Sequence, residues 1–457
     1  MSHSYPLRAG SCTLSRIKDR DRDRSVDERS DSMWRGMKPA IIIAAALLAF
    51  VFKIALALNT YGTNDILTWE GNVAKIIADG GLAWYRDGVE IPVTFNDGSH
   101  VIRTQLNNHP PLLIHVLRAW DYLAHVSGLP FRFWLRFTSS LADIGSLLLV
   151  WNILTVTKVS IRLPALLLVA FSPVSVMVSG FHGNTDPVMV FLLLSSVYLI
   201  ESGRPVWLAG AVFGLSMSVK VVPIIFVPVF LLYLPSMWKR TEFVLCAGGI
   251  FVAGFLPYLA QDPALIIHRV FGYSGTLGPW GLSWLIYVLV PEAPLTAYAT
   301  VGKWLALCIV MVVSLSMNWN GSRPALFLQC GRVAFLFLFW APGFGVQYLA
   351  WLVPWGAALT GRAIRFYYIA SGVFLFCFYS LWSRGFPWFL ANTWDHVLPF
   401  WPMVFVVLLE LTCWISVGAV AFSYRRMLAP DSHSQEDTRM PRAYSMFVEA
   451  NGGPSQS

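Results

Sequence analysis

The stretch SGFHGNTDPVMV, residues 179–190, places polar side chains between two strongly apolar runs of the sequence. Its His182, Asn184 and Asp186 are groups that can bind a polar substrate or accept a proton, and they are costly at membrane depth. Asp186 also precedes a proline at the start of an apolar run, where a carboxylate can simply begin a helix. Because Gly183 allows close backbone approach at the same point, a functional cluster is the favoured interpretation.

A second carboxylate, Asp65, lies in YGTNDILTWEGNVAKIIADGG, residues 61–81. Asn64 is a good N-cap residue, and apolar residues follow it at helical spacing, namely Ile66, Trp69, Val73, Ile76 and Ile77. The pattern predicts a helix that lies flat on a membrane surface with Asp65 in its first turn. There the carboxylate either complements the helix dipole or acts as a general base near a lipid headgroup.

Cationic and amide side chains that could bind phosphate follow later in the chain. Lys220 separates two short apolar runs, where it either reaches for the interface or binds an anion. His268 and Arg269 lie within residues 261–284, which we expect to form a long outer loop. An arginine there can pair bidentately with phosphate, or it can simply be solvated. Gln347 begins an apolar run after a glycine-rich turn and could equally make an interhelical hydrogen bond.

Composition identifies the class of protein that must position these groups. Of the 457 residues, 56% are hydrophobic and 13% are charged, against about 25% charged in a soluble domain. The apolar runs extend from residue 39 to residue 422, which predicts an all-α polytopic membrane protein. A net charge of +8 would suggest nucleic-acid binding in a soluble protein, but here Lys and Arg lie in short loops and set topology. The six cysteines are scattered, which argues against a disulfide framework or a zinc site.

About twelve apolar segments suggest transmembrane helices, although several are shorter than the roughly 20 residues of a straight span. They are residues 39–58, 136–155, 164–180, 186–200, 206–219, 221–234, 243–259, 295–317, 324–341, 346–360, 366–383 and 398–422. The segments 206–219 and 221–234 could also form a single bent helix. The segment 110–126 has apolar residues at helical spacing but also carries charged residues and histidines. It is therefore predicted to lie in the interface rather than to cross.

Charge in the loops predicts the orientation. If residues 110–126 do not cross, most loop Lys and Arg residues fall on the side of the basic N-terminus, which the positive-inside rule makes cytoplasmic. SGFHGNTDP and the long first loop, residues 59–135, then face outward, and both termini are cytoplasmic. The polar tails, residues 1–38 and 423–457, are predicted to be disordered. We expect the transmembrane domain, residues 39–422, to lie in the inner (cytoplasmic) membrane of a bacterium.

The order and one-sidedness of these motifs resemble the GT-C superfamily of membrane glycosyltransferases. The resemblance begins with an acidic residue soon after the first span, in TNDILTWE (63–70). It continues with a Pro-Pro juxtamembrane helix, NNHPPLLIHVL (107–117). Later segments similar to the family are LRFTSSLADIGSLLLVW (135–151), SPVSVMVSGFHGNTDPVMVFLLL (172–194), LAGAVFGLSMSVKVVPIIFVPVFLL (208–232) and APGFGVQYLAWLVPW (341–355). The resemblance covers roughly residues 40–420. It implies a GT-C fold of about twelve transmembrane helices, with juxtamembrane helices in the first external loop.

The resemblance also implies a role for each candidate residue. Asp65 would be the general base on the acceptor hydroxyl, and Asp186 would be a second catalytic residue, an acidic group that orients acceptor or donor. The residues expected to bind substrate, the first three by holding the carrier phosphate, are Lys220, His268, Arg269, His182, Asn184, His109 and Gln347.

The implied activity is the inverting transfer of a hexose, with mannose the expected sugar, from a polyprenyl-phosphate donor. The acceptor would be a glycan, lipid or protein outside the cytoplasm, and cationic side chains would stabilise the leaving monophosphate. Neither a metal nor another cofactor is therefore expected. The alternative is a secondary transporter or flippase for a lipid-linked sugar. Against it stands the scarcity of ionisable residues in mid-span, where Lys53 and Arg332 are the exceptions. A non-catalytic scaffold would need the outer acids to be helix caps only.

Two features depart from the family. Its oligosaccharyltransferases carry a large soluble C-terminal domain, and the short polar tail of this sequence argues against that branch. Residues 84–105, WYRDGVEIPVTFNDGSHVIRTQ, match no family motif and are predicted to be a polar loop that could shape the acceptor site.

Overall fold

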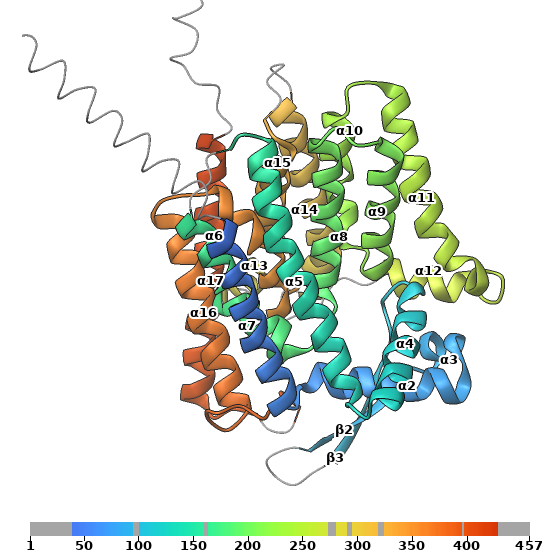
Figure 1. The fold of residues 1–457 in the computed structure, drawn as a ribbon. Helices are drawn as coiled ribbons and strands as arrows, with labels where there is room; N and C mark the ends of the chain where they lie inside the picture. Colours follow the sequence, from blue (N-terminus) through green and yellow to red (C-terminus); the bar gives the residue numbers. More distant parts are fainter. Residues whose placement is uncertain are drawn as a thin grey trace, which may run out of the picture.

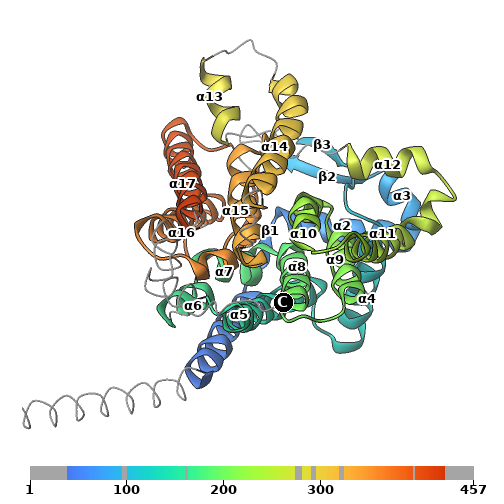
Figure 2. The same cartoon turned by 90° about the horizontal axis from the view of Figure 1, so that it is seen from above.

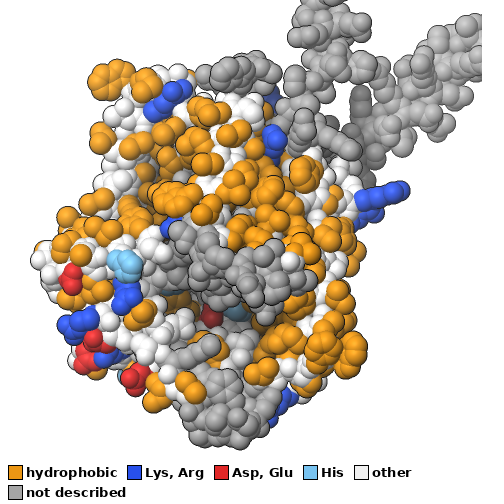
Figure 3. All heavy atoms as spheres, turned by 180° about the vertical axis from the view of Figure 1, so that it is seen from behind, with side chains coloured by type: hydrophobic (Ala, Val, Ile, Leu, Met, Phe, Trp, Pro, Cys, Tyr) orange, Lys and Arg blue, Asp and Glu red, His pale blue; other side chains and the backbone are white. Residues whose placement is uncertain are grey.

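The computed structural model describes residues 39–94, 100–159, 163–272, 280–289, 295–318, 324–394 and 397–427. These residues form a helical bundle with a group of shorter elements at one end (Figure 1). Hydrophobic side chains cover much of the face seen in Figure 3, and acidic side chains gather toward the end that carries the shorter elements. The prediction of an all-α polytopic membrane protein is confirmed.

Among the described residues, seven helices are long and apolar enough to cross a membrane. They are Pro39–Asn59, Phe131–Val156, Leu163–His182, Met237–Leu259, Val301–Asn318, Arg362–Trp382 and Phe400–Tyr424. Three further apolar helices are shorter, namely Val206–Val219, Val222–Tyr233 and Leu326–Trp340. Several of the expected spans are therefore short or interrupted. Two of the interruptions lie next to polar residues, at His182 and at Lys220.

The bundle consists of two groups of packed helices (Figure 2). One group contains α5 (Phe131–Val156), α8 (Asp186–Glu201), α9 (Val206–Val219) and α11 (Met237–Leu259). The other contains α14 (Leu295–Asn318), α15 (Leu326–Trp340), α16 (Arg362–Trp382) and α17 (Phe400–Met427). Between α5 and α8 the chain forms α6 (Leu163–Ala170), α7 (Pro173–Met177) and a π-helical turn, Val178–His182.

Lys220 lies at the tip of a short helical hairpin. Helix α9 ends at Val219, Lys220 is extended, and a 3-10 turn, Val222–Phe226, leads into α10 (Val227–Tyr233). The hydroxyl of Tyr233 donates to Glu201 at the end of α8, so α10 returns to the end from which α9 starts. The 14 residues of α9 span about 21 Å, less than the roughly 30 Å of a hydrocarbon core. Lys220 is thus recessed below the end of the bundle.

Two other expectations about secondary structure were wrong. Residues 261–284 were expected to be a loop, but Asp262 caps helix α12 (Pro263–Phe271) by accepting from the Leu265 N–H at 3.0 Å. A further helix, α13 (Gly281–Leu289), begins before the expected loop ends. The expected span at 346–360 instead consists of two 3-10 turns, Val346–Trp351 and Pro354–Ala358.

The shorter elements at the end of the bundle form their own hydrophobic cluster. Helices α2 (Asn64–Asp79), α3 (Gly81–Arg86) and α4 (Leu112–Ser127) contribute residues that include Ile66, Trp69, Ile76, Trp84, Leu113, Leu117 and Trp120. The predicted apolar face of α2 is therefore buried, except for Ile77, which is exposed. Thr63, not Asn64, caps α2. Helix α4 covers most of residues 110–126 and packs against α2 and α5, and it is not among the helices long and apolar enough to cross.

The polar insertion at 84–105, expected to be a loop, instead begins with the end of α3 and continues as an antiparallel hairpin. Strand β2 (Val89–Thr94) pairs with β3 (His100–Gln105), with Val89 opposite Gln105 and Thr94 opposite His100. The sequence pattern missed the strands because Pro92 and the charged residues interrupt the apolar alternation that marks a strand. The hairpin delivers Gln105 to the polar end of the bundle.

Lys53 belongs to a buried ionic cluster inside the bundle. Its ammonium group contacts the Asp143 carboxylate and donates to the Ser175 hydroxyl at 2.8 Å, and the Ser179 hydroxyl donates to Asp143 at 3.2 Å. The side chain of Lys53 is 1% exposed and that of Asp143 is 14% exposed. Asp143, which the sequence analysis passed over, thus explains why a lysine is tolerated within the first span.

Replacing Lys53 with methionine is expected to destabilise the protein by about 3–5 kcal/mol, because it leaves the Asp143 carboxylate buried without its cation. The double variant Lys53→Met/Asp143→Leu removes both charges and should recover most of that loss. Thermal unfolding of the detergent-purified variants measures both effects. A single variant as stable as the wild type, or a double variant no more stable than the single one, would contradict the prediction.

The segment that leads into α2 is fixed on both sides. Arg136, which is fully buried, donates to the carbonyls of Ala57 and Thr60 at 2.8 and 2.9 Å and so caps the end of the first helix. The next residues form β1 (Gly62–Thr63), which pairs in parallel with β4 (Leu390–Ala391), in the segment between α16 and α17. Asp65, two residues beyond β1, therefore begins α2 from a fixed position.

Candidate active site

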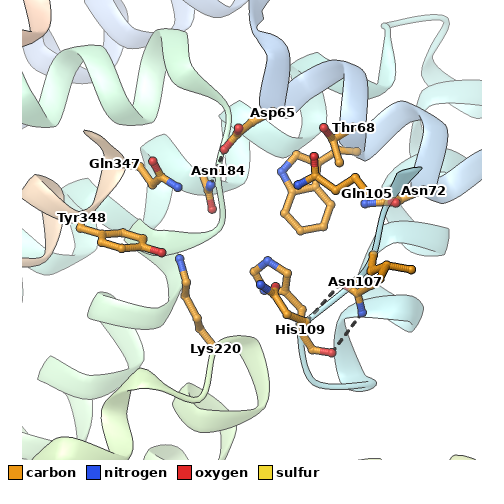
Figure 4. A pocket seen from close by; sticks show the side chains of 13 residues that line it. Asp65, Thr68, Asn72, Gln105, Asn107, His109, Asn184, Lys220, Gln347 and Tyr348 are labelled. Atoms are coloured by element: carbon orange, nitrogen blue, oxygen red, sulfur yellow. Dashed lines mark hydrogen bonds between the residues drawn. The ribbon is translucent and has the colours of Figure 1, made fainter. Parts of the chain in front are cut away.

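A polar pocket lies between the bundle and the elements at its end (Figure 4). It has a volume of about 130 Å³ and is lined by Asp65, Thr68, Trp69, Asn72, Gln105, Leu106, Asn107, Asn108, His109, Asn184, Lys220, Gln347 and Tyr348. Five of the predicted site residues, Asp65, His109, Asn184, Lys220 and Gln347, thus share one cavity although they are far apart in the sequence.

The Asp65 carboxylate is held by two donors from the SGFHGNTDP segment. His182 Nε2 lies 3.0 Å from Asp65 Oδ2, and Asn184 Nδ2 donates to the same oxygen at 2.8 Å. Among the described residues, both side-chain contacts go to Oδ2, so Oδ1 is left for a substrate. Burial raises the pKa of Asp65, but His182, Asn184 and the nearby charge of Lys220 together lower it by more. The net pKa lies below its ordinary value, and Asp65 is ionised at neutral pH.

The local backbone explains how these donors reach Asp65. The π-helical turn Val178–His182 ends at Gly183, which has φ +80°. A Cβ at Gly183 would lie 2.1 Å from the Ile66 side chain of α2, so only glycine allows this close approach. The other ring nitrogen of His182 lies 2.9 Å from the Tyr379 hydroxyl in α16, which fixes the orientation of the ring.

Lys220 is held by a buried carboxylate and two aromatic rings. Its ammonium group donates to Asp186 Oδ1 at 2.8 Å and lies 4.7 Å from the ring centre of Tyr348 and 5.2 Å from that of Trp351. The indole N–H of Trp351 also donates to Asp186 Oδ1. The Lys220 side chain is 12% exposed and faces the pocket, whereas Asp186 is fully buried.

Asp186 does not line the polar pocket. The expectation that it acts directly on a substrate is therefore corrected, since its carboxylate lies behind Lys220 and contacts that residue and Trp351 instead. Its position at the start of α8, preceding Pro187, matches the alternative of a helix N-terminus. In the structure the Asp186 carboxylate holds the Lys220 ammonium group at 2.8 Å.

His109 lines the wall facing Lys220, where its ring packs on Trp69 with the ring centres 5.1 Å apart. Burial and the neighbouring charge of Lys220 lower the pKa of His109 to about 3, so the ring is neutral at physiological pH. Within the described part of the chain, its buried Nδ1 has no hydrogen-bond partner. A neutral imidazole with a free nitrogen can bind a hydroxyl group of a substrate.

His268 and Arg269 are not part of the pocket, which corrects the prediction that they hold a phosphate with Lys220. Both lie on α12, where the His268 side chain is exposed and Arg269 Nε donates to the Tyr85 carbonyl at 3.0 Å. This bond ties α12 to α3. The prediction failed because these residues lie on a helix and not on an open loop near the site.

Several pocket residues were missed by the sequence analysis. Thr68 and Asn72 follow Asp65 on the same face of α2, and their spacing of three and seven residues is a signal that could have found them. Gln105 and Asn107 come from the hairpin and the turn after it, and Tyr348 comes from a 3-10 turn. No periodic pattern marks the last three.

Two larger cavities adjoin the polar pocket. The first, of about 330 Å³, is mainly apolar and shares Lys220, His109, Asn108 and Tyr348 with the pocket; its walls include Val222, Ile225, Phe271, Trp304, Leu307 and Phe337. The second, of about 650 Å³, shares Asp65, Gln105, Leu106 and Gln347 with the pocket. We call them the apolar cavity and the α16–α17 cavity. Lys220 thus borders the first and Asp65 the second, with the polar pocket between them.

No group of three or more His, Cys, Asp or Glu side chains that could hold a metal ion occurs among the described residues. All five cysteines in the same ranges are free.

Replacing Asn184 with alanine is expected to move the acid limb of the pH profile of any Asp65-dependent reaction upward by about one pH unit. Asn184 donates to the ionised carboxylate, and loss of such a bond raises the pKa of that group. In the wild-type protein, the midpoint of this acid limb should lie at a pH below the usual pKa range of an aspartate. The measurement is kcat/KM against pH. Asn72→Ala, which alters the same pocket without contacting Asp65, serves as the control, and an unmoved limb in Asn184→Ala would contradict the assignment.

Comparison with known proteins adds one finding. Residues 110–264, about a third of the chain, match the sequence profile of glycosyltransferase family 87. No curated protein sequence matches the chain. The matched segment runs from α4 through α11 into α12, and it contains His182, Asn184, Asp186 and Lys220. This segment is therefore similar to a glycosyltransferase family, which is consistent with the resemblance to the GT-C superfamily.

Proposed function

We propose that this glycosyltransferase transfers a hexose from a polyprenyl-phosphate donor to an acceptor on the extracytoplasmic face, with inversion at the anomeric carbon. The observation that carries the proposal is the order of the three cavities: apolar cavity, polar pocket, α16–α17 cavity. Lys220 stands at the first junction and Asp65 at the second. A prenyl chain fits the apolar cavity, its phosphate fits Lys220, and the hexose fits the polar pocket between Lys220 and Asp65.

In the proposed reaction an acceptor hydroxyl lies at Asp65 Oδ1. Its oxygen attacks the anomeric carbon as the bond between that carbon and the phosphate oxygen breaks. The electron pair of that bond leaves with the lipid phosphate, and the hydroxyl proton passes to Asp65. His182 and Asn184 keep Asp65 ionised and oriented, which is the state a general base needs.

Lys220 stabilises the charge that develops on the leaving phosphate. Its contact with buried Asp186 fixes the ammonium group at the junction of the two cavities before the donor binds. A phosphate held by Lys220 needs no bridging metal ion, and we propose that the reaction is metal-independent.

The orientation of the chain in the membrane is also a proposal. Lys158, Arg204, Lys239 and Arg362 lie at the ends of α5, α8, α11 and α16 that are remote from the polar pocket. The positive-inside rule makes that end cytoplasmic. The pocket then faces outward, and both chain termini lie in the cytoplasm.

The proposal is tested by incubating the purified protein with a panel of polyprenyl-phosphate hexoses, mannose included, in the presence of EDTA. Loss of carrier-linked sugar with appearance of a glycosylated acceptor is the expected result. Nucleotide sugars serve as the comparison and should not be consumed. Protein-dependent movement of the lipid-linked sugar across vesicles, without bond cleavage, would instead identify a flippase. Activity restored only by Mg²⁺ or Mn²⁺ would refute metal independence.

A further inference from the structure

The backbone that carries His182 and Asn184 is held by side chains from other elements. We call residues 178–184 the 178–184 turn; it consists of the π-helical turn and the first two residues after it. Carbonyls at the end of a helix have no partner within the helix, so such a turn needs donors from outside. Three carbonyls of the turn accept from side-chain hydroxyls: Ser179 from Ser140, His182 from Thr63 and Asn184 from Ser139.

One face of α5 supplies two of these donors and a carboxylate. The Ser139 hydroxyl donates to the Asn184 carbonyl at 2.5 Å, and the Ser140 hydroxyl donates to the Ser179 carbonyl at 3.2 Å. Asp143 accepts from the Ser179 hydroxyl at 3.2 Å. Positions 139, 140 and 143 lie within about 100° of one another around an α-helix. The same face of α5 therefore binds the turn near its start and at its end.

Ser139 and Ser140 differ from other hydroxyl residues of α5 in where they donate. A hydroxyl in an apolar helix commonly donates to the carbonyl four residues earlier. Thr138 and Ser146 do so, both at 2.9 Å. Ser139 and Ser140 are 0% exposed and donate to another element instead. Their polarity could be satisfied within the helix, so the bonds to the turn indicate a role in holding it.

The first helix supports the turn as well. A Cβ at Gly180 would lie 2.9 Å from the Lys53 Cα, so the backbone of the turn packs directly on that helix. The Lys53 ammonium group contacts the Asp143 carboxylate, and the buried ionic cluster thus joins the first helix to α5. Because packed interiors leave little free space, a shift of the turn would disturb both helices.

A fixed turn matters because two of its side chains hold the same oxygen of Asp65. His182 Nε2 lies 3.0 Å from Asp65 Oδ2, and Asn184 Nδ2 donates to that oxygen at 2.8 Å. Hydrogen bonds weaken steeply as their geometry is lost, so a small displacement of the Asn184 backbone weakens the bond to Asp65. Ser139 opposes this displacement, because it is bonded to the Asn184 carbonyl.

We propose that Ser139 and Asp143 are positioning residues for sugar transfer. They fix the 178–184 turn so that His182 and Asn184 hold the Asp65 carboxylate where it can take the acceptor proton. The inference rests on the proposed transfer reaction and adds two residues of a membrane-spanning helix to it. Neither Ser139 nor Asp143 lines the polar pocket, so neither is expected to affect donor binding.

Replacing Ser139 with alanine should lower kcat about 10- to 100-fold and leave the donor KM unchanged, because displacement of a catalytic group by about 1 Å can cost that much. The acid limb of kcat/KM against pH should move upward, since Asn184 no longer holds the ionised carboxylate in place. Ser139→Cys, which keeps the size of the side chain but is a weaker donor, should fall between.

Ser146→Ala is the matched control. Ser146 is 1% exposed, lies on the same helix and donates to the Ala142 carbonyl of that helix. Its replacement also removes a buried hydroxyl, so thermal unfolding of the two alanine variants compares their effects on the fold. Ser146→Ala should change neither kcat nor the acid limb.

Double variants show whether the two residues act through the turn. Adding Ser139→Ala to Asn184→Ala should move the acid limb no further than Asn184→Ala alone, because both changes loosen the same contact with Asp65. Additive movements of the limb would overturn the role of Ser139. Lys53→Met/Asp143→Leu, expected above to recover stability, should still lower kcat about tenfold. A kcat equal to that of the wild type in this variant would overturn the role of Asp143.

A labelling experiment reads the protonation of Asp65 without sugar transfer. Dicyclohexylcarbodiimide reacts with protonated carboxyl groups, so its reaction with Asp65 over a pH series has a midpoint that reports the pKa. Peptide mass spectrometry quantifies the product, with Asp65→Asn as the blank. Ser139→Ala should raise the midpoint by about half a pH unit or more, and Ser146→Ala should leave it in place.

The variants at Ser139 and Ser146 leave the ionisable groups near Asp65 unchanged, namely His182, Lys220, His109 and Tyr379. A raised midpoint in Ser139→Ala therefore comes from a displaced turn. An unmoved midpoint in Ser139→Ala, or an equal rise in Ser146→Ala, would overturn the inference. A raised midpoint in a protein that consumes no polyprenyl-phosphate hexose would overturn only the proposed reaction.

Discussion

Asp65→Asn is expected to lower the rate of sugar transfer by about 10²- to 10⁴-fold, the usual contribution of a general base. The asparagine keeps the shape of the side chain and can still accept the hydrogen bond from Asn184, so the fold should be retained. It cannot take the proton of the acceptor hydroxyl. Single-turnover transfer from a polyprenyl-phosphate hexose, measured with donor binding as a second readout, checks the prediction.

The control for this prediction is Asp79→Asn, at the other end of the same helix. Asp79 is 49% exposed and pairs with Lys75, four residues earlier, so its loss should leave the transfer rate unchanged. Donor affinity of Asp65→Asn should match that of the wild type, because the proposed phosphate site is at Lys220, not at Asp65. A substantial rate in Asp65→Asn would remove the carboxylate from the reaction.

Lys220→Met is expected to lower transfer by about 10²- to 10³-fold, comparable to the loss of one donor that stabilises a developing negative charge. The substitution also leaves the Asp186 carboxylate buried without its cation, which costs about 3–5 kcal/mol and can unfold the protein. The double variant Lys220→Met/Asp186→Leu removes that penalty. It should fold and remain inactive, as measured by thermal unfolding beside the transfer assay.

Asp186→Asn tests the positioning role separately. If Asp186 acts only through Lys220, this variant should raise the donor KM and leave the pH profile set by Asp65 in place. Adding Asp186→Asn to Lys220→Met should then cost little further activity, because both changes act on the same ammonium group. Full additivity of the two losses would mean that Asp186 contacts the substrate directly.

The polytopic fold and the centre of the site could be predicted from the sequence because their signals are local. Apolar runs define helices, and Asp65, Asn184 and Lys220 stand out as polar groups next to such runs. Asp186 was found for the same reason, but a pattern cannot tell whether a carboxylate faces a cavity or lies behind its neighbour. That distinction depends on the packing of α8 against the turn that carries Trp351.

The residues that were missed or misplaced depend on tertiary contacts. Gln105 reaches the pocket through a hairpin whose strands show no clear alternation of apolar and polar residues. Arg269 does not reach the pocket and donates a hydrogen bond to the Tyr85 carbonyl instead. Asp143 escaped notice because a single acid does little to the apolar character of a long helix. The expectation that Lys53 and Arg332 were the exceptional ionisable residues in mid-span was therefore wrong.

The two-residue ladder between β1 and β4 has a consequence for the timing of catalysis. It joins the backbone just before Asp65 to the segment between α16 and α17. Strand β4 packs against α16, which forms one wall of the α16–α17 cavity, so the start of α2 is attached to the frame of that cavity. We therefore expect filling of the cavity to affect the position of Asp65, so that glycosyl transfer follows acceptor binding and the donor is hydrolysed slowly when no acceptor is present.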